Sequence, residues 1–229
     1  MIEIAVFVYY CVYMEEFSAT GPVPFNSRLI YNPRRRQEVW RYITYAFIHA
    51  GFYHVFFNVI IQLALGIPLE LIHKGWRVAI LYLAGVISGS LAASISDPTS
   101  YLAGASGGVY ALISAHLANV LINWKEMEFA AIRLFGLIVF AMTDVGVAVY
   151  ERYGGKKNRT SYAAHIAGAI SGLLVGIVTL RNLKKSRWET VLGYIAITTY
   201  VLLMTAIVLF NIFNPDYFLP IETSDYDQF

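Results

Sequence analysis

The chain has 229 residues, of which 58% are hydrophobic and 14% are charged, and its mean hydropathy is +0.56. A soluble domain carries about 25% charged residues, so this composition argues against one and is typical of a protein that crosses a membrane several times. The net charge of +2 gives no sign of a nucleic-acid-binding surface, and the single cysteine, Cys11, excludes an intrachain disulfide.

Seven apolar stretches predict seven helices. The first, residues 2–14, is shorter than the about 20 residues that a helix needs to cross the hydrocarbon core. The other six reach or nearly reach this length, and a β-barrel is disfavoured because their apolar runs are continuous rather than alternating. These are residues 54–72, 77–96, 102–122, 129–150, 161–180 and 190–213. We therefore expect an all-α, polytopic membrane helical bundle.

The predicted helices form one membrane domain, residues 1–229. Its core is expected at about 1–182, an additional C-terminal helix at about 190–213 and a tail at 214–229. A long polar and aromatic connection, about residues 15–53, joins the first two helices and contains Trp40-Arg41. Lys and Arg residues divide almost evenly between the two sides, but the dense cluster at 181–187 favours the cytosol for its side, which would leave the acidic tail lumenal or extracellular.

Four polar residues are predicted to lie at one depth in the membrane. His54 and Asn58 fall in the first turns of the second helix, Ser106 near the start of the fourth and His165 near the start of the sixth. Alternate helices of a bundle start at the same face, so all four lie within about 10 Å of it. Polar side chains are costly inside a bilayer, and their convergence therefore indicates a functional site.

The first part of this site is a serine between glycines. Ser106 stands in Gly104-Ala105-Ser106-Gly107-Gly108, which matches G-x-S-x-G without the strand that a hydrolase nucleophile elbow requires. The glycines would allow close backbone approach at a helix N-terminus, whose N–H groups point where an oxyanion develops. A simpler explanation is that the Ser-Gly pair only caps the helix.

The second part consists of two histidine positions. His165 precedes a stripe of small residues that includes Gly168 and Gly172, which brings its helix close to a neighbour and makes the imidazole a candidate base. His54 and Asn58 continue with Gln62 as a polar stripe that suits an oxyanion hole or interhelical hydrogen bonds. The spacing alone leaves open whether His54 or His165 is the base.

Together these motifs resemble the rhomboid family of intramembrane serine proteases. The resemblance rests on Trp40-Arg41, His54-Val-Phe-Phe-Asn58, Gly104-Ala-Ser106-Gly, Tyr110 and Ala164-His165-Ile-Ala-Gly168-Ala-Ile-Ser-Gly172, in family order over most of the chain. A helix after the histidine-bearing one is similar to the six-plus-one arrangement of eukaryotic secretory-pathway rhomboids, which implies a six-helix core plus one C-terminal helix.

The resemblance also implies roles for individual residues. Ser106 would be the nucleophile and His165 the base of a Ser–His dyad, without the aspartate of soluble triads. His54, Asn58 and the Ser106 backbone N–H would form the oxyanion hole, and Tyr110 would stack on His165 and orient it. Gly104 would allow the approach of the substrate strand. The remaining small residues expected at sites of substrate approach or helix packing are Gly107, Gly168 and Gly172.

Other polar residues are assigned lesser roles. Asp144, inside the fifth helix, is expected to make hydrogen bonds within the bundle rather than to complete a triad. His116 is expected to be structural and His49 to lie in a loop that touches water. The glycosylation sequon at Asn158 is expected to remain unmodified, because it lies against the membrane. The sequence contains no metal-binding constellation, and no cofactor is implied.

The implied reaction is acyl transfer to Ser106 from a peptide bond in the transmembrane segment of a single-pass protein. The protein would then be a multi-pass membrane protein of the secretory pathway or plasma membrane, with the site open to the lumenal or extracellular side. Partners would be such substrates and the lipid bilayer, without nucleic acid, and the oligomeric state stays open. One alternative is a catalytically silent relative that binds client proteins in trafficking or degradation; another, a transporter, would need half-helices and inverted repeats.

Overall fold

The computed structural model describes residues 2–153, 161–184 and 186–221, with the backbone alone described at 140 and 144–153. These residues form α-helices and short 3₁₀ helices, and an all-α fold is confirmed. The α-helices are α1 (Ile2–Tyr13), α2 (Arg41–Thr44), α3 (Phe52–His73), α4 (Gly75–Ser96), α5 (Ser106–Ile122), α6 (Ala130–Tyr153), α7 (Tyr162–Thr179) and α8 (Arg187–Phe213). The 3₁₀ helices are η1 (Pro33–Arg35), η2 (Tyr45–Phe47) and η3 (Pro215–Tyr217).

The longest helices are apolar enough to cross a membrane. Within the described residues, four helices meet the length and hydropathy that a span requires, namely α3, α4, α7 and α8. Helices α1 and α5 and the first part of α6 are apolar but shorter. A helical membrane bundle is thus confirmed, whereas seven spans remain a prediction. Helix α5 begins at Ser106 rather than at residue 102, because Leu102 instead pairs in an extended bridge with Tyr31.

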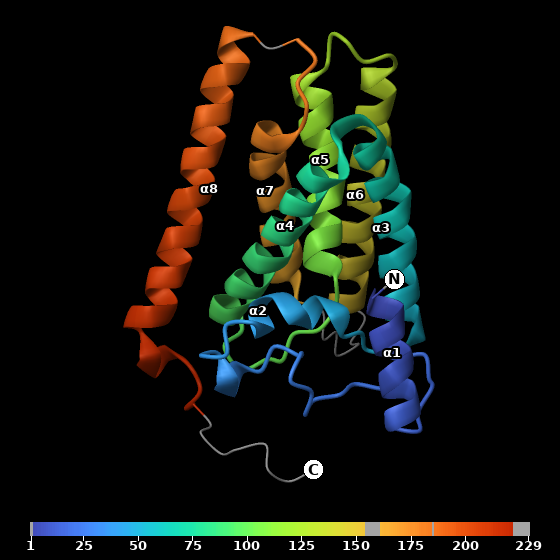
Figure 1. Ribbon diagram of the computed structural model, residues 1–229, viewed down its shortest axis with the longest axis vertical. Helices are drawn as coiled ribbons and strands as arrows, with labels where there is room; N and C mark the ends of the chain where they lie inside the picture. The colour runs from blue at the N-terminus through green and yellow to red at the C-terminus, as the bar shows by residue number, and fades with distance from the viewer. Residues whose placement is uncertain (1, 154–160, 185, 222–229) are drawn as a thin grey trace.

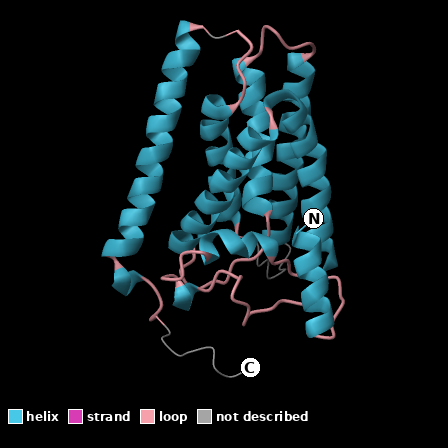
Figure 2. Cartoon of the chain, in the orientation of Figure 1, coloured by secondary structure: helices cyan, strands magenta, loops and turns pink. Residues whose placement is uncertain are grey.

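The helices run side by side, and their connecting segments gather at the two ends of the bundle (Figures 1 and 2). Helices α4, α5 and α7 pack against one another, with α3 and α6 beside α5. Helix α8 stands at the edge of the bundle, and α1, α2 and the first connection lie at the end where α3, α5 and α7 begin (Figure 1). This end carries the polar residues singled out in the sequence.

Small residues set the spacing of the three central helices. A Cβ added at Gly168 of α7 would overlap the carbonyl of Gly107 in α5, and one at Gly172 would overlap the backbone of Ala111. On the other side of α5, a Cβ at Gly85 of α4 would overlap the Ala111 side chain. The backbones of these helices therefore touch, as in small-xxx-small packing.

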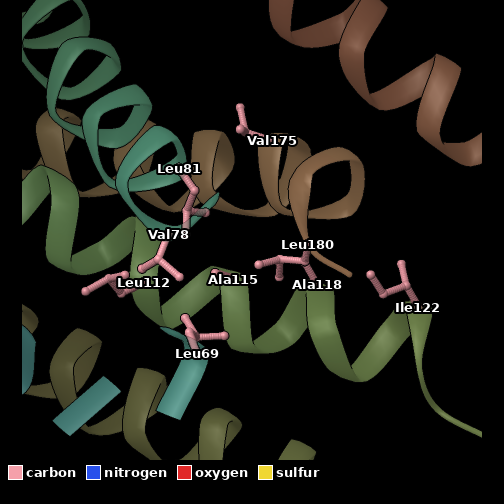
Figure 3. Packing of buried hydrophobic residues seen from close by; sticks show 9 residues of the cluster. All are labelled: Leu69, Val78, Leu81, Leu112, Ala115, Ala118, Ile122, Val175 and Leu180. Atoms are coloured by element: carbon pink, nitrogen blue, oxygen red, sulfur yellow. The ribbon is translucent and has the colours of Figure 1, made fainter. Parts of the chain in front are cut away.

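The main apolar cluster lies in the half of the bundle away from this end. Leu81 of α4, Leu112 of α5 and Val175 of α7 are buried there and interdigitate with Leu69 from α3 (Figure 3). A second buried cluster lies at the site end and includes Tyr31, Tyr45, Val86 and Leu102. Both halves of the bundle therefore contain buried apolar side chains.

The connection before α3, residues 14–51, is folded rather than irregular. Arg41 is 1% exposed, and its guanidinium donates to Glu38 at 2.7 Å and to the carbonyls of Ser27 at 2.8 Å and Ile30 at 2.5 Å. A buried charge is tolerated only when it is paired and hydrogen-bonded. Arg41 therefore holds three separate turns of the connection together, which explains how a polar segment folds compactly beside the bundle.

Candidate active site

The site centres on Ser106 and His165. Ser106 is the first residue of α5, and His165 lies in the first turn of α7. The close contact between these helices at Gly107 and Gly168 brings the two side chains together, and His165 Nε2 lies 2.9 Å from Ser106 Oγ. With Nε2 unprotonated, the serine hydroxyl donates this hydrogen bond, which is the arrangement that a nucleophile and its general base require.

An aromatic ring fixes the plane of His165. Tyr110 lies one helical turn after Ser106, and its ring stacks on the imidazole with the centroids 4.2 Å apart and the planes 19° from parallel. Tyr162 contacts the imidazole edge-on, with the centroids 6.5 Å apart. Ser161 caps this same end of α7, and its hydroxyl accepts from the Ala164 N–H at 3.4 Å. The imidazole is thus held between rings with Nε2 directed at Ser106.

Gly104 brings a second imidazole to the serine. It has φ +115°, which favours glycine, and a Cβ there would meet the ring of His54. His54 Nδ1 accepts from the Ala50 N–H at 3.3 Å, so the neutral ring carries its proton on Nε2. His54 therefore presents a donor N–H beside the backbone that leads into Ser106.

Asn58 lies one helical turn after His54 on α3. It is buried, at 7% exposed, and its amide Nδ2 donates to the His54 carbonyl at 2.8 Å. This bond uses one of the two N–H groups of the amide. Gln62, the next residue of the polar stripe, instead accepts from Tyr82 OH at 2.9 Å. Within the stripe, Asn58 is therefore bonded to His54, whereas Gln62 is bonded to Tyr82 of α4.

His49 was expected to touch water, and this prediction is wrong. The residue is 2% exposed, and its ring lies 5.1 Å from that of His54 in an edge-on contact. Its Nε2 accepts from the Ala105 N–H at 3.4 Å. Burial, followed by the proximity of His54, lowers the pKa of His49 to about 3, so the ring is neutral. The spacing of five residues between His49 and His54 could have indicated that the two rings are close, but His49 was predicted to lie in a loop and was not paired with His54.

The start of α5 supplies further donors. The first helical bond of α5 runs from the Val109 N–H to the Ala105 carbonyl at 3.1 Å. The N–H groups of Ser106, Gly107 and Gly108 therefore precede the helical ladder, as the first amides of a helix do. Together with the positive end of the helix dipole, they create a positive potential around the serine.

Of the remaining candidates, only His116 has a described side chain. His116 Nε2 is 3.0 Å from the Leu65 carbonyl, a contact inside the bundle between α5 and α3. Asp144 lies in α6, but its side chain is outside the described residues, as is the whole Asn158 sequon. The role of Asp144 and the state of the sequon stay predictions.

Comparison with known proteins gives concordant matches. A family model described as the Rhomboid domain matches residues 36–182. The chain is 42% identical over 217 residues to Rhomboid-related protein 2 of Mus musculus, covering 92% of this chain and 72% of that protein. It is 38% identical over 221 residues to Rhomboid-related protein 3 of Homo sapiens, covering 93% of this chain and 55% of that protein.

A further relative bears on activity. The chain is 39% identical over 199 residues to Inactive rhomboid-related protein 2 of Caenorhabditis elegans, covering 86% of this chain and 57% of that protein. The chain thus spans little more than half the length of several curated relatives that it matches, and these relatives differ in what their names say of activity.

Proposed function

The chain belongs to the rhomboid family of integral membrane proteins, and we propose that it is an active intramembrane serine endopeptidase that cleaves transmembrane segments of single-pass membrane proteins. The observation that carries the proposal is the 2.9 Å contact between His165 Nε2 and Ser106 Oγ beneath the stacked ring of Tyr110. The contact between Gly107 of α5 and Gly168 of α7 brings these two groups together.

In the proposed reaction, Ser106 Oγ attacks the scissile carbonyl while His165 Nε2 takes the hydroxyl proton. The tetrahedral intermediate collapses when His165 returns this proton to the leaving amine, which leaves an acyl ester on Ser106. Water then attacks the ester while His165 takes one of its protons, and His165 returns this proton to Ser106 Oγ as the acid product leaves. Tyr110 keeps the imidazole aligned through both proton transfers.

The oxyanion would be stabilised by three donors. The Ser106 backbone N–H lies at the start of α5, His54 carries a proton on Nε2 next to Gly104, and Asn58 has a second N–H beyond the one that it gives to the His54 carbonyl. Donors of this kind act strongly where water is scarce. We assign the oxyanion hole to His54, Asn58 and the Ser106 N–H.

The substrate must present an extended backbone to this site. Helical amides are shielded, so a transmembrane substrate has to unwind near the membrane boundary, which favours segments with Gly or other helix-weakening residues. Gly104 has no side chain to obstruct the approach of such a strand. We place the protein in the secretory pathway or plasma membrane, with the site open to the lumenal or extracellular face.

Labelling with a serine-directed fluorophosphonate tests the proposal. We expect the wild-type chain and Ser96→Ala, a control at an exposed serine at the end of α4, to be labelled, whereas Ser106→Ala and His165→Ala are not. A reconstituted single-pass substrate should be cut only by the labelled proteins. Labelling that persists in Ser106→Ala, or folded wild-type protein that neither labels nor cleaves, would exclude the dyad.

A catalytically silent, client-binding role is the second candidate, since a relative that is 39% identical is named inactive. Such a protein would retain the membrane fold and bind single-pass clients without cutting them. It predicts equal client capture by wild type and Ser106→Ala and no fluorophosphonate labelling of either. The presence of both Ser106 and His165 in hydrogen-bonding contact favours the enzyme.

A further inference from the structure

The chain after α8 folds back onto the connection that precedes α3. Residues 215–221, here called the C-terminal segment, begin with η3 at the end of the bundle where the candidate site lies. Phe218 is only 7% exposed, although it lies beyond the last helix. It contacts the rings of Tyr217 and Phe210, at 5.1 Å and 6.2 Å between centroids. A terminal segment with a buried aromatic residue is docked in place.

One arginine of the connection holds this segment. Arg36 Nη1 donates to the Leu219 carbonyl at 2.8 Å, and Nη2 donates to the Pro215 carbonyl at 3.4 Å. The same guanidinium lies 4.5 Å from the centroid of the Phe218 ring. A planar cation that bonds two carbonyls and stacks on an aromatic face makes a specific contact that lysine could not reproduce.

The segment is also attached to the end of α4. Tyr217 OH donates to the Ile95 carbonyl at 2.7 Å, and Ser94 Oγ donates to Asn211 Oδ1 of α8 at 3.1 Å. Helix α4 ends at Ser96 and is followed, after residues 97–99, by residues 100–105. We call residues 100–105, which precede Ser106, the serine loop. The C-terminal segment thus bridges two structures that border the serine loop.

The connection in turn holds the serine loop. Tyr31 exchanges two backbone hydrogen bonds with Leu102, at 3.1 Å and 3.2 Å, and the Gly104 N–H donates to the Tyr45 carbonyl at 3.1 Å. Between Tyr31 and Arg36, the Asn32 side chain accepts from the Arg34 N–H at 2.9 Å and closes η1. Phe218 is therefore linked to Ser106 by the contact with Arg36, the short segment 31–36, the hydrogen bonds between Tyr31 and Leu102, and the backbone of the serine loop.

We propose that residues 215–221 form a strap that positions Ser106, with Arg36 and Phe218 as its positioning residues. The serine loop has no helical ladder of its own, so its placement depends on the connection, and the strap restrains the connection from its outer side. The additional helix α8 would then serve to carry the strap from the far end of the bundle to the site. The catalytic consequence rests on the proposed protease function.

Fluorophosphonate kinetics test this consequence, with the reversible inhibitor constant KI separated from the inactivation rate kinact. Phe218→Leu removes the ring under Arg36, and we expect kinact to fall by about tenfold, because small misplacements of a nucleophile cost up to about 100-fold. KI should change little. The matched control is Phe213→Leu, since Phe213 is 74% exposed at the end of α8, and its kinact should equal that of wild type.

Two further comparisons separate positioning from general stability. Phe218→Tyr keeps the ring and should restore kinact to within about twofold of wild type. Arg36→Ala also loses the hydrogen bonds to Leu219 and Pro215, so it should lower kinact at least as far as Phe218→Leu. The double variant should be no slower than Arg36→Ala, because both changes release the same segment. Arg187→Ala, at the exposed other end of α8, controls for lost charge. Strap variants that unfold at lower temperature but keep the wild-type kinact would overturn the proposal.

Hydrogen exchange gives a readout that does not depend on catalysis. The N–H groups of Leu102, Gly104 and Ala105 are donors in the contacts described above, and their exchange should accelerate in Phe218→Leu but not in Phe213→Leu. If the wild type shows no labelling but exchange is faster in Phe218→Leu than in Phe213→Leu, the proposed protease function is contradicted and the proposed strap is supported. If exchange in the serine loop is the same in both variants, the strap is refuted whatever the labelling shows.

Discussion

The Ala50 backbone N–H determines which ring nitrogen of His54 carries the proton. Because the Ala50 N–H occupies Nδ1, the neutral ring must carry hydrogen on Nε2, the nitrogen that faces Gly104. Asn58 donates a hydrogen bond to the His54 carbonyl and so stabilises the same turn of α3. These contacts favour His54 as a fixed donor and leave the role of base in the proposed dyad to His165, a choice that sequence spacing alone left open.

The first prediction concerns Asn58. Asn58→Ala should lower the cleavage rate by about 10- to 1,000-fold, since removal of one oxyanion donor typically costs about 100- to 1,000-fold and two other donors remain here. The matched control is Gln62→Ala, one turn further along α3, whose partner is Tyr82. It should cleave at close to the wild-type rate. Rates would be measured on folded protein with one substrate, and equal losses in both variants would point to damage to α3 rather than to a lost donor.

The second prediction concerns His49 and pH. Its pKa is lowered to about 3 in the folded protein by burial, and by His54 nearby, whereas an unfolded histidine titrates near about 6.5. The unfolded state thus binds the extra proton first, so the stability from neutral His49 is fully present above pH 6.5 and is lost as pH falls towards 3. One such group changes the free energy of unfolding by at most about 1.4 kcal/mol per pH unit.

The comparison that isolates this effect uses His49→Gln, which cannot titrate but can still accept from the Ala105 N–H. Melting temperatures would be measured between pH 7.5 and pH 4.5. We expect the wild-type temperature to fall more steeply than that of the variant. Parallel curves would show that His49 does not titrate on unfolding.

At the scale of elements, the contact between α5 and α7 decides whether the dyad forms. Gly168→Val would push a side chain into the Gly107 carbonyl, which is backbone and has no room to yield. We expect a lower melting temperature and loss of fluorophosphonate labelling, since Ser106 and His165 separate when the helices part. Gly193→Val in α8 makes the same change where nothing lies within 4 Å, and it should retain both properties. Labelling retained in Gly168→Val would argue against this view of the contact.

The elements also show which features a sequence can predict. Apolar runs predicted α3 to α8 within a few residues, because membrane helices need little more than length and hydropathy. Because alternate helices share a face, Ser106 and His165 were predicted at one depth, and the resemblance to the rhomboid family added Tyr110 beside His165. The folded connection was not predicted, because Arg41 organises it through carbonyls of residues distant in sequence. The burial of His49 and Phe218 was not predicted for the same reason, because both residues are buried only by tertiary contacts.

The whole molecule has two dissimilar ends. The dyad, the connection and the strap lie where α3, α5 and α7 begin, whereas the Lys and Arg cluster at 181–187 lies between the end of α7 and the start of α8. Basic residues in short loops favour the cytosol. The site should therefore open to the lumenal or extracellular side, although the two sides carry nearly equal numbers of basic residues.

Single-cysteine labelling in intact cells tests this orientation. With the only native cysteine removed by Cys11→Ser, we would introduce Thr99→Cys at the site end and, in a separate protein, Glu126→Cys at the other. Both positions are exposed, and neither change alters a basic residue. A membrane-impermeant maleimide should label Thr99→Cys at the surface of intact cells and Glu126→Cys only after permeabilisation. The reverse pattern would place the site in the cytosol, where it would meet the opposite ends of its substrates, and the proposed orientation would have to be inverted.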